Sequence, residues 1–198
     1  MRDPEQNQDL SMLSTPLPAL VIVSGLPASG KSTLAEHIAR ELGWPLFTKD
    51  AFKERLFDTG AIDPDQFDRS ASGVLGAQAV AILLDVMTTL IGARVNVVVE
   101  SNFRPHLARK DLGPMLGVAN GRQVHCTLER EQIIERYRVR FEGRARHPVH
   151  LDSIAIHELN AQIDAGFGEP LPLDAPLISV DTQNGYRPAL DEIIAFCR

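Results

Sequence analysis

The sequence is poor in cysteine, in aromatic residues and in long apolar runs, and each shortage excludes a class of protein. Two cysteines are too few for a disulfide framework, and neither has neighbours at metal-ligand spacing. Aromatic residues make up only 6% of the chain, which leaves few rings for stacking nucleic-acid bases. No apolar run approaches the ~20 residues of a membrane span, and the acidic N-terminus lacks the apolar core of a secretory signal. We therefore expect a cytoplasmic protein that does not bind membranes.

The chain also lacks an excess of positive charge. Its 20 Lys and Arg residues against 26 Asp and Glu residues give a formal net charge of −6. The molecule as a whole is therefore not a basic nucleic-acid binder, although a local basic patch is possible. An apolar fraction of 44% is ordinary for a globular protein, and 198 residues suit one well-buried domain. We expect a flexible, polar tail over residues 1–18 and a single domain over 19–198.

A phosphate-binding loop is the clearest motif present. Residues 25–32 read Gly-Leu-Pro-Ala-Ser-Gly-Lys-Ser, between a strand expected over 19–23 and a helix expected over 33–42. The two glycines allow consecutive N–H groups to wrap a phosphate chain, and the helix N-terminus adds its positive end. Lys31 is expected to reach the outer phosphates of a nucleoside triphosphate, and the Ser32 hydroxyl to bind Mg²⁺. The expected nucleotide-binding residues of this loop are Gly25, Pro27, Ala28, Ser29, Gly30, Lys31, Ser32 and Thr33.

Strands and helices alternate along the rest of the chain. The apolar patterns predict strands over 44–48, 95–99, 122–128 and 177–182, and helices over 51–57, 65–92, 106–116, 130–141, 152–165 and 188–196. The 65–92 segment is interpreted as one long helix, or as two helices broken near Gly73 and Gly76. Such alternation predicts an α/β fold: a three-layer α/β/α sandwich of the P-loop NTPase type with a five-stranded parallel sheet. Ligands are then expected at the carboxyl ends of the strands.

Two acidic residues fall at those strand ends. Asp50 follows the second strand and could accept the proton of an attacking hydroxyl, or serve as the N-cap of the next helix. Glu100 ends the third strand and is costly to bury without a partner. It could hold Mg²⁺ together with Ser32 or contact a substrate, and the pattern does not decide between these roles. The substrate-binding residues expected at this edge are Asp50, Lys53, Glu100, Asn102 and Arg104.

A dense group of arginines lies close to residue 140. Guanidinium groups on a mobile segment can stabilise the charge that develops during phosphoryl transfer, so we expect a short arginine-rich lid over residues 142–150. Neighbouring glutamates indicate that some arginines form only surface ion pairs, and this is the interpretation of Arg130 and Arg136. The arginines expected to take part in catalysis are Arg138, Arg144 and Arg146. The nucleotide-binding residues expected outside the loop are Arg140 and Thr182.

Together these segments resemble the small P-loop kinase group, which includes chloramphenicol phosphotransferase, the zeta-toxin kinases and the kinase domain of phage-type polynucleotide kinase. The segments that carry the resemblance are 25–32, 48–54, 97–103 and 136–150. It covers most of residues 19–198 and implies ATP and Mg²⁺ as cofactors, Asp50 as the base that activates the acceptor hydroxyl, and lid arginines that hold the phosphates. Glu100 stands where the group often has an aspartate. Members use very different acceptors, so no acceptor is implied.

Several functions stay open at this point. The first is an ATP- and Mg²⁺-dependent kinase that phosphorylates a hydroxyl of a small molecule, as a monomer or homodimer. The second is a 5′-hydroxyl polynucleotide kinase, which the acidic charge and the few aromatic residues disfavour. The third is a nucleotide sensor or toxin-type regulator, which the joint presence of Lys31, Ser32 and Asp50 disfavours. Lid arginines also suit a nucleoside monophosphate kinase. The pattern does not distinguish ATP from GTP.

Overall fold

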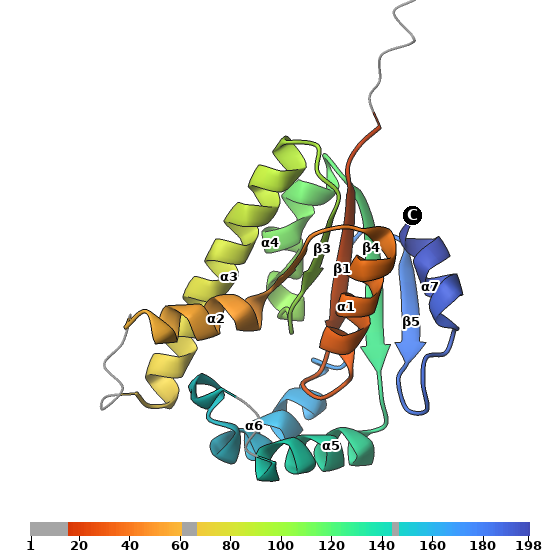
Figure 1. Ribbon diagram of the computed structural model, residues 1–198. Helices are drawn as coiled ribbons and strands as arrows, with labels where there is room; N and C mark the ends of the chain where they lie inside the picture. Colours follow the sequence, from red (N-terminus) through yellow and green to blue (C-terminus); the bar gives the residue numbers. More distant parts are fainter. Residues whose placement is uncertain (1–15, 61–66, 144–146) are drawn as a thin grey trace, which may run out of the picture.

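A computed structural model describes residues 16–60, 67–143 and 147–198. Within this part, five parallel strands form one sheet in the order β2-β3-β1-β4-β5 (Figure 1). The strands are β1 (Ala19–Gly25), β2 (Leu46–Thr48), β3 (Val97–Glu100), β4 (Asn120–Thr127) and β5 (Leu177–Asp181). The helices are α1 (Lys31–Leu42), α2 (Lys49–Asp58), α3 (Arg69–Gly92), α4 (Pro105–Leu116), α5 (Arg130–Glu142), the short 3-10 helix η3 (Pro148–His150), α6 (Asp152–Asp164) and α7 (Leu190–Cys197). The predicted α/β fold with a five-stranded parallel sheet is confirmed.

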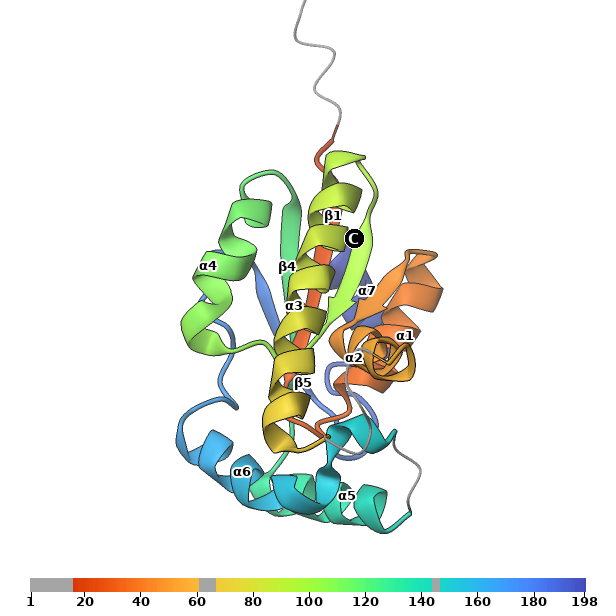
Figure 2. The same cartoon turned by 90° about the vertical axis from the view of Figure 1, so that its left-hand side faces the viewer.

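The central strand β1 is buried on both faces because its side chains alternate between two apolar cores. Leu20 and Ile22 pack with residues of α3 and α4, while Val21 and Val23 pack with residues of α1 and α7. The helices therefore cover the two faces of the sheet as separate layers (Figures 1 and 2). A strand buried on both faces needs a continuous apolar run rather than an alternating one, which is the pattern of residues 19–23.

Helices α5 and α6 lie across the carboxyl ends of the strands instead of on a face of the sheet (Figure 1). A small core holds them there, in which Leu26 of the loop after β1 packs with Ile133 and Tyr137 of α5 and Leu159 of α6. The phosphate-binding loop is thus enclosed between the sheet and this helix pair. Of the lid expected over 142–150, residues 144–146 lie outside the described part of the chain.

Helix α3 decides between two alternatives and differs from one expectation. It is one continuous helix of 24 residues, the first of the two alternatives, because neither Gly73 nor Gly76 breaks the helical backbone. By length and composition alone it is apolar enough to cross a membrane, since an 18-residue window within it has a mean hydropathy of 2.0, so the expectation that no apolar run approaches this length is wrong. Small residues between the aliphatic ones mask the length of the run in the sequence. In the fold the helix covers the sheet with a buried stripe that includes Leu75, Leu83 and Met87.

The N-cap of α2 differs from one of the two roles expected for Asp50. Helix α2 begins at Lys49, and the Thr48 hydroxyl accepts the Ala51 N–H at 3.1 Å, so Thr48 and not Asp50 is its N-cap. Asp50 therefore lies in the first turn of α2, where its carboxylate is not required as a cap.

Candidate active site

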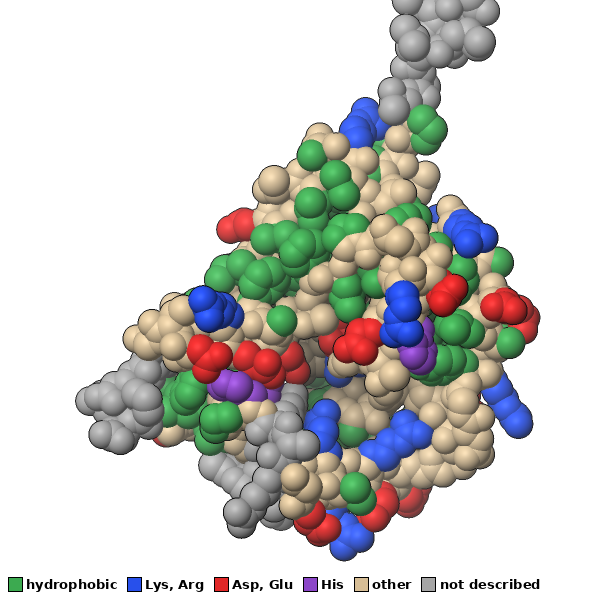
Figure 3. Space-filling model, viewed as in Figure 1, with side chains coloured by type: hydrophobic (Ala, Val, Ile, Leu, Met, Phe, Trp, Pro, Cys, Tyr) green, Lys and Arg blue, Asp and Glu red, His purple; other side chains and the backbone are tan. Residues whose placement is uncertain are grey.

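A cavity of about 430 Å³ opens at the carboxyl ends of β1 and β3, where the phosphate-binding loop meets α2, α3, α5 and α6. The space-filling view shows the surface hollowed between the sheet and α5, with lysine and arginine side chains at its margin (Figure 3). The predicted site residues that line the cavity are Gly25, Pro27, Lys31, Ser32, Asp50, Lys53, Glu100, Asn102, Arg104 and Arg140. The fold thus brings together residues that come from four separate parts of the sequence.

The phosphate-binding loop depends on glycine at both of its ends. Gly25 has a φ of 141°, and a Cβ atom there would lie 2.7 Å from the Cys126 carbonyl oxygen. Gly30 has a φ of 82°, and a Cβ atom there would lie 3.3 Å from the Thr182 side chain. Residues that carry a Cβ atom rarely adopt such positive φ values, so only glycine can occupy these two closely packed positions without strain. The loop therefore packs closely against β4 and the segment after β5.

A buried ion pair between Lys31 and Glu100 lines the cavity next to the phosphate-binding loop. Glu100 is 4% exposed, and its carboxylate lies 3.4 Å from the Lys31 ammonium and accepts the Ser32 hydroxyl at 3.0 Å. These two partners explain why a charged residue can end a buried strand. They also bring a hydroxyl and a carboxylate oxygen together next to the phosphate-binding loop. Mg²⁺ prefers such oxygen ligands and takes its others from water and phosphates, so Ser32 and Glu100 fit this ion.

No larger metal site competes with this one among the described residues. In that part of the chain, no group of three or more His, Cys, Asp or Glu side chains is arranged to hold a metal ion. A magnesium ion that bridges nucleotide phosphates needs only one or two protein carboxylates. The donor set at Ser32 and Glu100 is of this kind.

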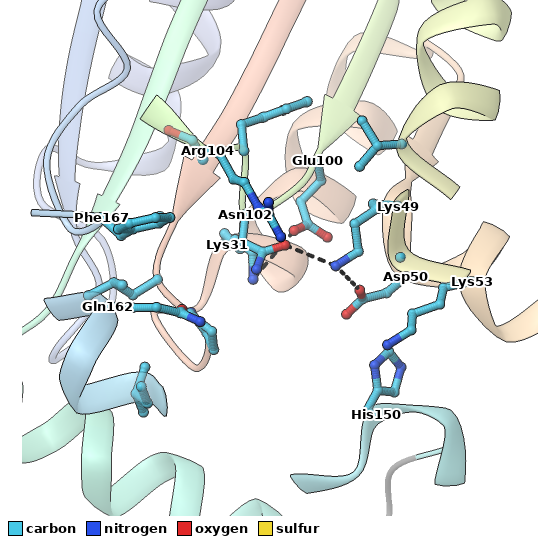
Figure 4. A pocket seen from close by; sticks show the side chains of 18 of the residues that line it. Lys31, Lys49, Asp50, Lys53, Glu100, Asn102, Arg104, His150, Gln162 and Phe167 are labelled. Atoms are coloured by element: carbon cyan, nitrogen blue, oxygen red, sulfur yellow. Dashed lines mark hydrogen bonds and ion pairs between the residues drawn. The ribbon is translucent and has the colours of Figure 1, made fainter. Parts of the chain in front are cut away.

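Asp50 is joined to the loop after β3 through Lys49, for which the sequence pattern predicts no role. The Lys49 ammonium lies 3.1 Å from the Asp50 carboxylate and donates a hydrogen bond to the Asn102 side-chain oxygen at 3.0 Å (Figure 4). Thr48 pairs with Glu100 where β2 and β3 lie side by side, which brings the residues after each strand into contact. The predicted cluster of Asp50, Glu100 and Asn102 at one edge of the sheet is therefore present, and Lys49 links two of its members.

Two other cations of the cavity have partners in the protein. Lys53 is buried and donates a hydrogen bond to the Ser72 hydroxyl at 2.6 Å, and that hydroxyl donates in turn to the Val149 carbonyl oxygen at 2.9 Å. The Arg140 guanidinium lies over the Tyr137 ring, 5.3 Å from its centroid. Lys53 therefore connects α2 with α3 and η3, in addition to lining the cavity.

The rest of the cavity lining includes residues that belong to no sequence motif. Arg69 of α3 and Glu158 of α6 form an ion pair within the cavity lining. His150 of η3 contacts Glu54 of α2 at 2.8 Å between Nε2 and Oε1. Their separations in the sequence are 89 and 96 residues, so only the tertiary fold reveals these contacts. The lining residues for which the sequence predicts no role include Lys49, Arg69, Glu158, Gln162 and Phe167.

The structure changes the interpretation of two arginines on α5. Arg138 is exposed and pairs with Glu135 and Glu142, and it is not among the described residues that line the cavity, so its predicted catalytic role is not supported. Arg136 is not the surface residue that the sequence pattern predicts, because it donates to the carbonyl oxygens of Thr182 at 2.8 Å and of Gln183 at 3.1 Å. Arg136 therefore anchors the segment after β5 to the helix pair above the strand ends.

Other predicted residues lie beside the cavity or outside the described chain. The Thr182 hydroxyl donates to the Ser29 carbonyl oxygen at 2.8 Å, so Thr182 supports the phosphate-binding loop from behind. Arg130 forms the surface contacts expected of it, with Asp164 at 2.7 Å and Asn160 at 2.8 Å. The predicted lid arginines Arg144 and Arg146 lie outside the described residues.

Two buried groups next to the loop are not suited to react. The His125 Nε2–H donates to the Gly168 carbonyl oxygen at 2.8 Å, and Nδ1 contacts the Ser24 hydroxyl at 3.2 Å. Burial lowers the pKa of His125, which keeps the imidazole neutral. Burial raises the pKa of the Cys126 thiol to about 12, so almost no nucleophilic thiolate is present at neutral pH. Both residues therefore serve the packing of β4.

Comparison with solved structures shows that most of the chain has a kinase fold. A protein from Chloroflexus aurantiacus j-10-fl, provisionally assigned as a kinase, is 31% identical, and the match covers 90% of this chain and 96% of that chain with a TM-score of 0.75. The shikimate kinase of Acinetobacter baumannii, in complex with shikimate, is 20% identical over 90% of this chain and 89% of that chain, with a TM-score of 0.55.

A component of the Pnkp1/Rnl/Hen1 RNA repair complex is also similar, at 20% identity and a TM-score of 0.55, over 82% of this chain and 50% of that chain. At such identities the last two likenesses show the fold alone. No curated protein sequence matches the chain.

The family model named AAA_33, described as an AAA domain, matches residues 20–165. This range extends from β1 to the end of α6 and so includes the phosphate-binding loop, Asp50, Glu100 and the helix pair above them. The chain therefore belongs to the AAA_33 family of AAA domains and is a P-loop kinase by fold.

Proposed function

We propose that the protein is an ATP- and Mg²⁺-dependent kinase that transfers the γ-phosphate to a hydroxyl group of a small molecule. The observation that carries this proposal is the continuous cavity that runs from Lys31 and Ser32 of the phosphate-binding loop to Asp50 at the start of α2. A kinase needs its phosphate site and its acceptor site to share one cavity, because the transferred group passes directly between them.

The polar side chains that line the cavity near the phosphate-binding loop each have a role in this reaction. Lys31 binds the outer phosphates, and Glu100 keeps its ammonium in place. Ser32 and Glu100 would hold Mg²⁺, which supplies neutralisation of the phosphate charge when bound. The acceptor oxygen forms the new bond to the γ-phosphorus while the bond from that phosphorus to the bridging oxygen of ADP breaks. The acceptor proton passes to the Asp50 carboxylate.

The size and lining of the cavity favour a small acceptor. A volume of about 430 Å³ is at the lower end of the range for small-molecule sites, and part of it is needed for the nucleotide phosphates. Val80, Phe103 and Leu107 supply apolar surface beside the charged residues. A polynucleotide would instead need a basic groove leading out of the cavity with aromatic platforms, and the net charge of −6 does not favour it.

The test is transfer of label from γ-labelled ATP with Mg²⁺ into a pooled metabolite extract. A parallel sample contains a 5′-hydroxyl oligonucleotide, and the Asp50→Asn variant is the control for both. We expect a labelled small molecule with the wild-type protein and almost none with the variant. Label on the oligonucleotide alone would replace the proposal with a polynucleotide kinase. Label that appears only as free phosphate, equally with the variant, would overturn both the acceptor class and the role of Asp50.

A further inference from the structure

We propose that Lys49 is a positioning residue of the phosphoryl transfer, which holds the Asp50 carboxylate and the Asn102 side chain together at the acceptor end of the cavity. This inference rests on the proposed function, because it assigns Lys49 a role that acts through the proposed base. Lys49 lines the cavity, and its side chain is only 16% exposed. The close view shows its ammonium between the two partners (Figure 4).

The bridge joins two segments that the chain does not connect locally. Lys49 and Asn102 are 53 residues apart, and their contact of 3.0 Å ties the first turn of α2 to the loop after β3. The second contact, of 3.1 Å, reaches the Asp50 carboxylate. An ammonium has three N–H donors, and the contacts to these two described residues can occupy two of them. One cation therefore restricts both the rotation of the Asp50 carboxylate and the position of the β3 loop.

Local helix physics would not produce this arrangement. Side chains at adjacent positions of a helix do not face each other, so a contact between Lys49 and Asp50 requires the lysine to turn from its usual direction. A lysine at the first position of a helix also meets the positive end of the helix dipole, which disfavours a cation. Departures from local preference of this kind are typical of functional sites, where another requirement selects the residue.

The other requirement is the orientation of the proposed base. Asp50 lines the cavity, and its carboxylate can accept the acceptor proton only while one of its oxygens faces the acceptor hydroxyl. The Lys49 ammonium, which contacts both Asp50 and Asn102, restricts the orientation of this carboxylate. Lys49 need not touch the reacting atoms to do this.

The test compares Lys49→Met, which keeps the length of the side chain and removes its charge, with Lys110→Met, in which an exposed lysine of α4 changes in the same way. With the acceptor found in the labelling screen, we expect Lys49→Met to lower kcat by roughly 10–10²-fold, as expected for a misplaced catalytic group. The Kd for ATP should change less than about twofold, and Lys110→Met should match the wild type. Lys49→Arg restores a cation and should recover most of kcat.

A double mutant separates positioning from an independent role. If Lys49 acts through Asp50, then Lys49→Met has almost no further effect on kcat in the Asp50→Asn background. An undiminished effect in that background, or a kcat for Lys49→Met equal to that of the wild type, would overturn the inference.

A spectroscopic measurement tests the bridge without any acceptor. The chain has only four lysines, so NMR of protein with ¹⁵N-labelled lysine gives few ammonium signals, and Lys49→Arg identifies the one from Lys49. We expect this signal to exchange slowly with water and to be lost in both Asp50→Asn and Asn102→Ala. A signal that persists in both variants would overturn the bridge even if kinase activity is present. A wild-type protein that shows the protected signal but labels no acceptor would instead overturn the proposed function, and with it the role of Lys49 in transfer.

Discussion

The Thr48 hydroxyl caps α2, and this leaves the Asp50 carboxylate to the cavity. A similar division of roles occurs at Glu100, whose two oxygens contact Lys31 and Ser32. The Thr48 contact lies within its own segment, whereas Glu100, at the end of β3, is held by two residues from the start of α1. The Glu100 side chain is thus oriented by contacts that a linear pattern cannot reveal, even though the pattern identifies the residue.

His125 gives a prediction for the pH dependence of stability. Burial lowers its pKa from the usual 6.5, so the unfolded chain takes up a proton as the pH falls below this value while the folded protein does not. Because the unfolded state then binds more protons, the free energy of unfolding decreases as the pH falls from about 7 toward the lowered pKa. We expect His125→Gln to be less stable than the wild type at pH 8, because the buried contacts of the imidazole with Gly168 and Ser24 are lost. Between pH 8 and pH 6, however, we expect the variant to lose less stability than the wild type. Urea unfolding at both pH values measures this, and parallel losses in the two proteins would contradict it.

Helix α3 shows how one element serves both the fold and the site. Its buried stripe covers the sheet, whereas Gly73, Gly76, Ala77 and Val80 line the cavity. Apart from the adjacent residues and the backbone of α3 itself, no atom of the described residues lies within 4 Å of the place where a Cβ of Gly76 would be, so the absence of a side chain leaves open space. Glycine within a helix is destabilising relative to alanine, so we infer that the open space beside Gly76 serves the binding of a ligand in the cavity.

Gly76→Ala should therefore separate stability from function. We expect the free energy of unfolding to rise by about 0.5–1 kcal/mol, because alanine favours the helix and restricts the unfolded chain. The KM for the acceptor should rise, since the methyl group enters the cavity. Gly92→Ala at the other end of α3 is the matched control, which should leave KM unchanged. Thermal unfolding and steady-state kinetics measure the two effects, and an unchanged KM in Gly76→Ala would show that the acceptor does not reach α3.

For the molecule as a whole, the fold could be predicted because its main signals are local. The apolar run of β1, the glycine spacing after it and the repeated strand–helix alternation each depend on neighbouring residues. The parts that could not be predicted depend on distant ones. The sequence near Arg136 predicts a surface residue, because the Thr182 carbonyl oxygen to which it donates lies 46 residues further along the chain. The partner of Lys49 is likewise distant, since Asn102 is 53 residues away and lies beside it only because β2 and β3 pair. The continuous α3 was ambiguous for another reason, because glycine weakens a helix without always breaking it.

The folded domain as a whole should respond to nucleotide. A ligand that binds only the folded state at 100 times its Kd adds about 2.7 kcal/mol of stability, which corresponds to an increase in Tm of about 5–10 °C for a chain of this size. We expect such a shift with ATP and Mg²⁺, and a much smaller one for Lys31→Ala, in which the outer phosphates lose their cation. Differential scanning fluorimetry over a range of ATP concentrations measures both. An equal shift in Lys31→Ala would contradict nucleotide binding at the phosphate-binding loop.

The account depends above all on Asp50 acting as the base of phosphoryl transfer rather than as a binding residue for nucleotide. The measurement is the single-turnover rate of label transfer from γ-labelled ATP to the identified acceptor, made with the wild type and with Asp50→Asn, together with the Kd for ATP of each. We expect transfer by Asp50→Asn to fall by about 10²–10⁴-fold while the Kd for ATP changes less than about twofold. Equal losses of ATP binding and of transfer would contradict the assignment of Asp50 as the base.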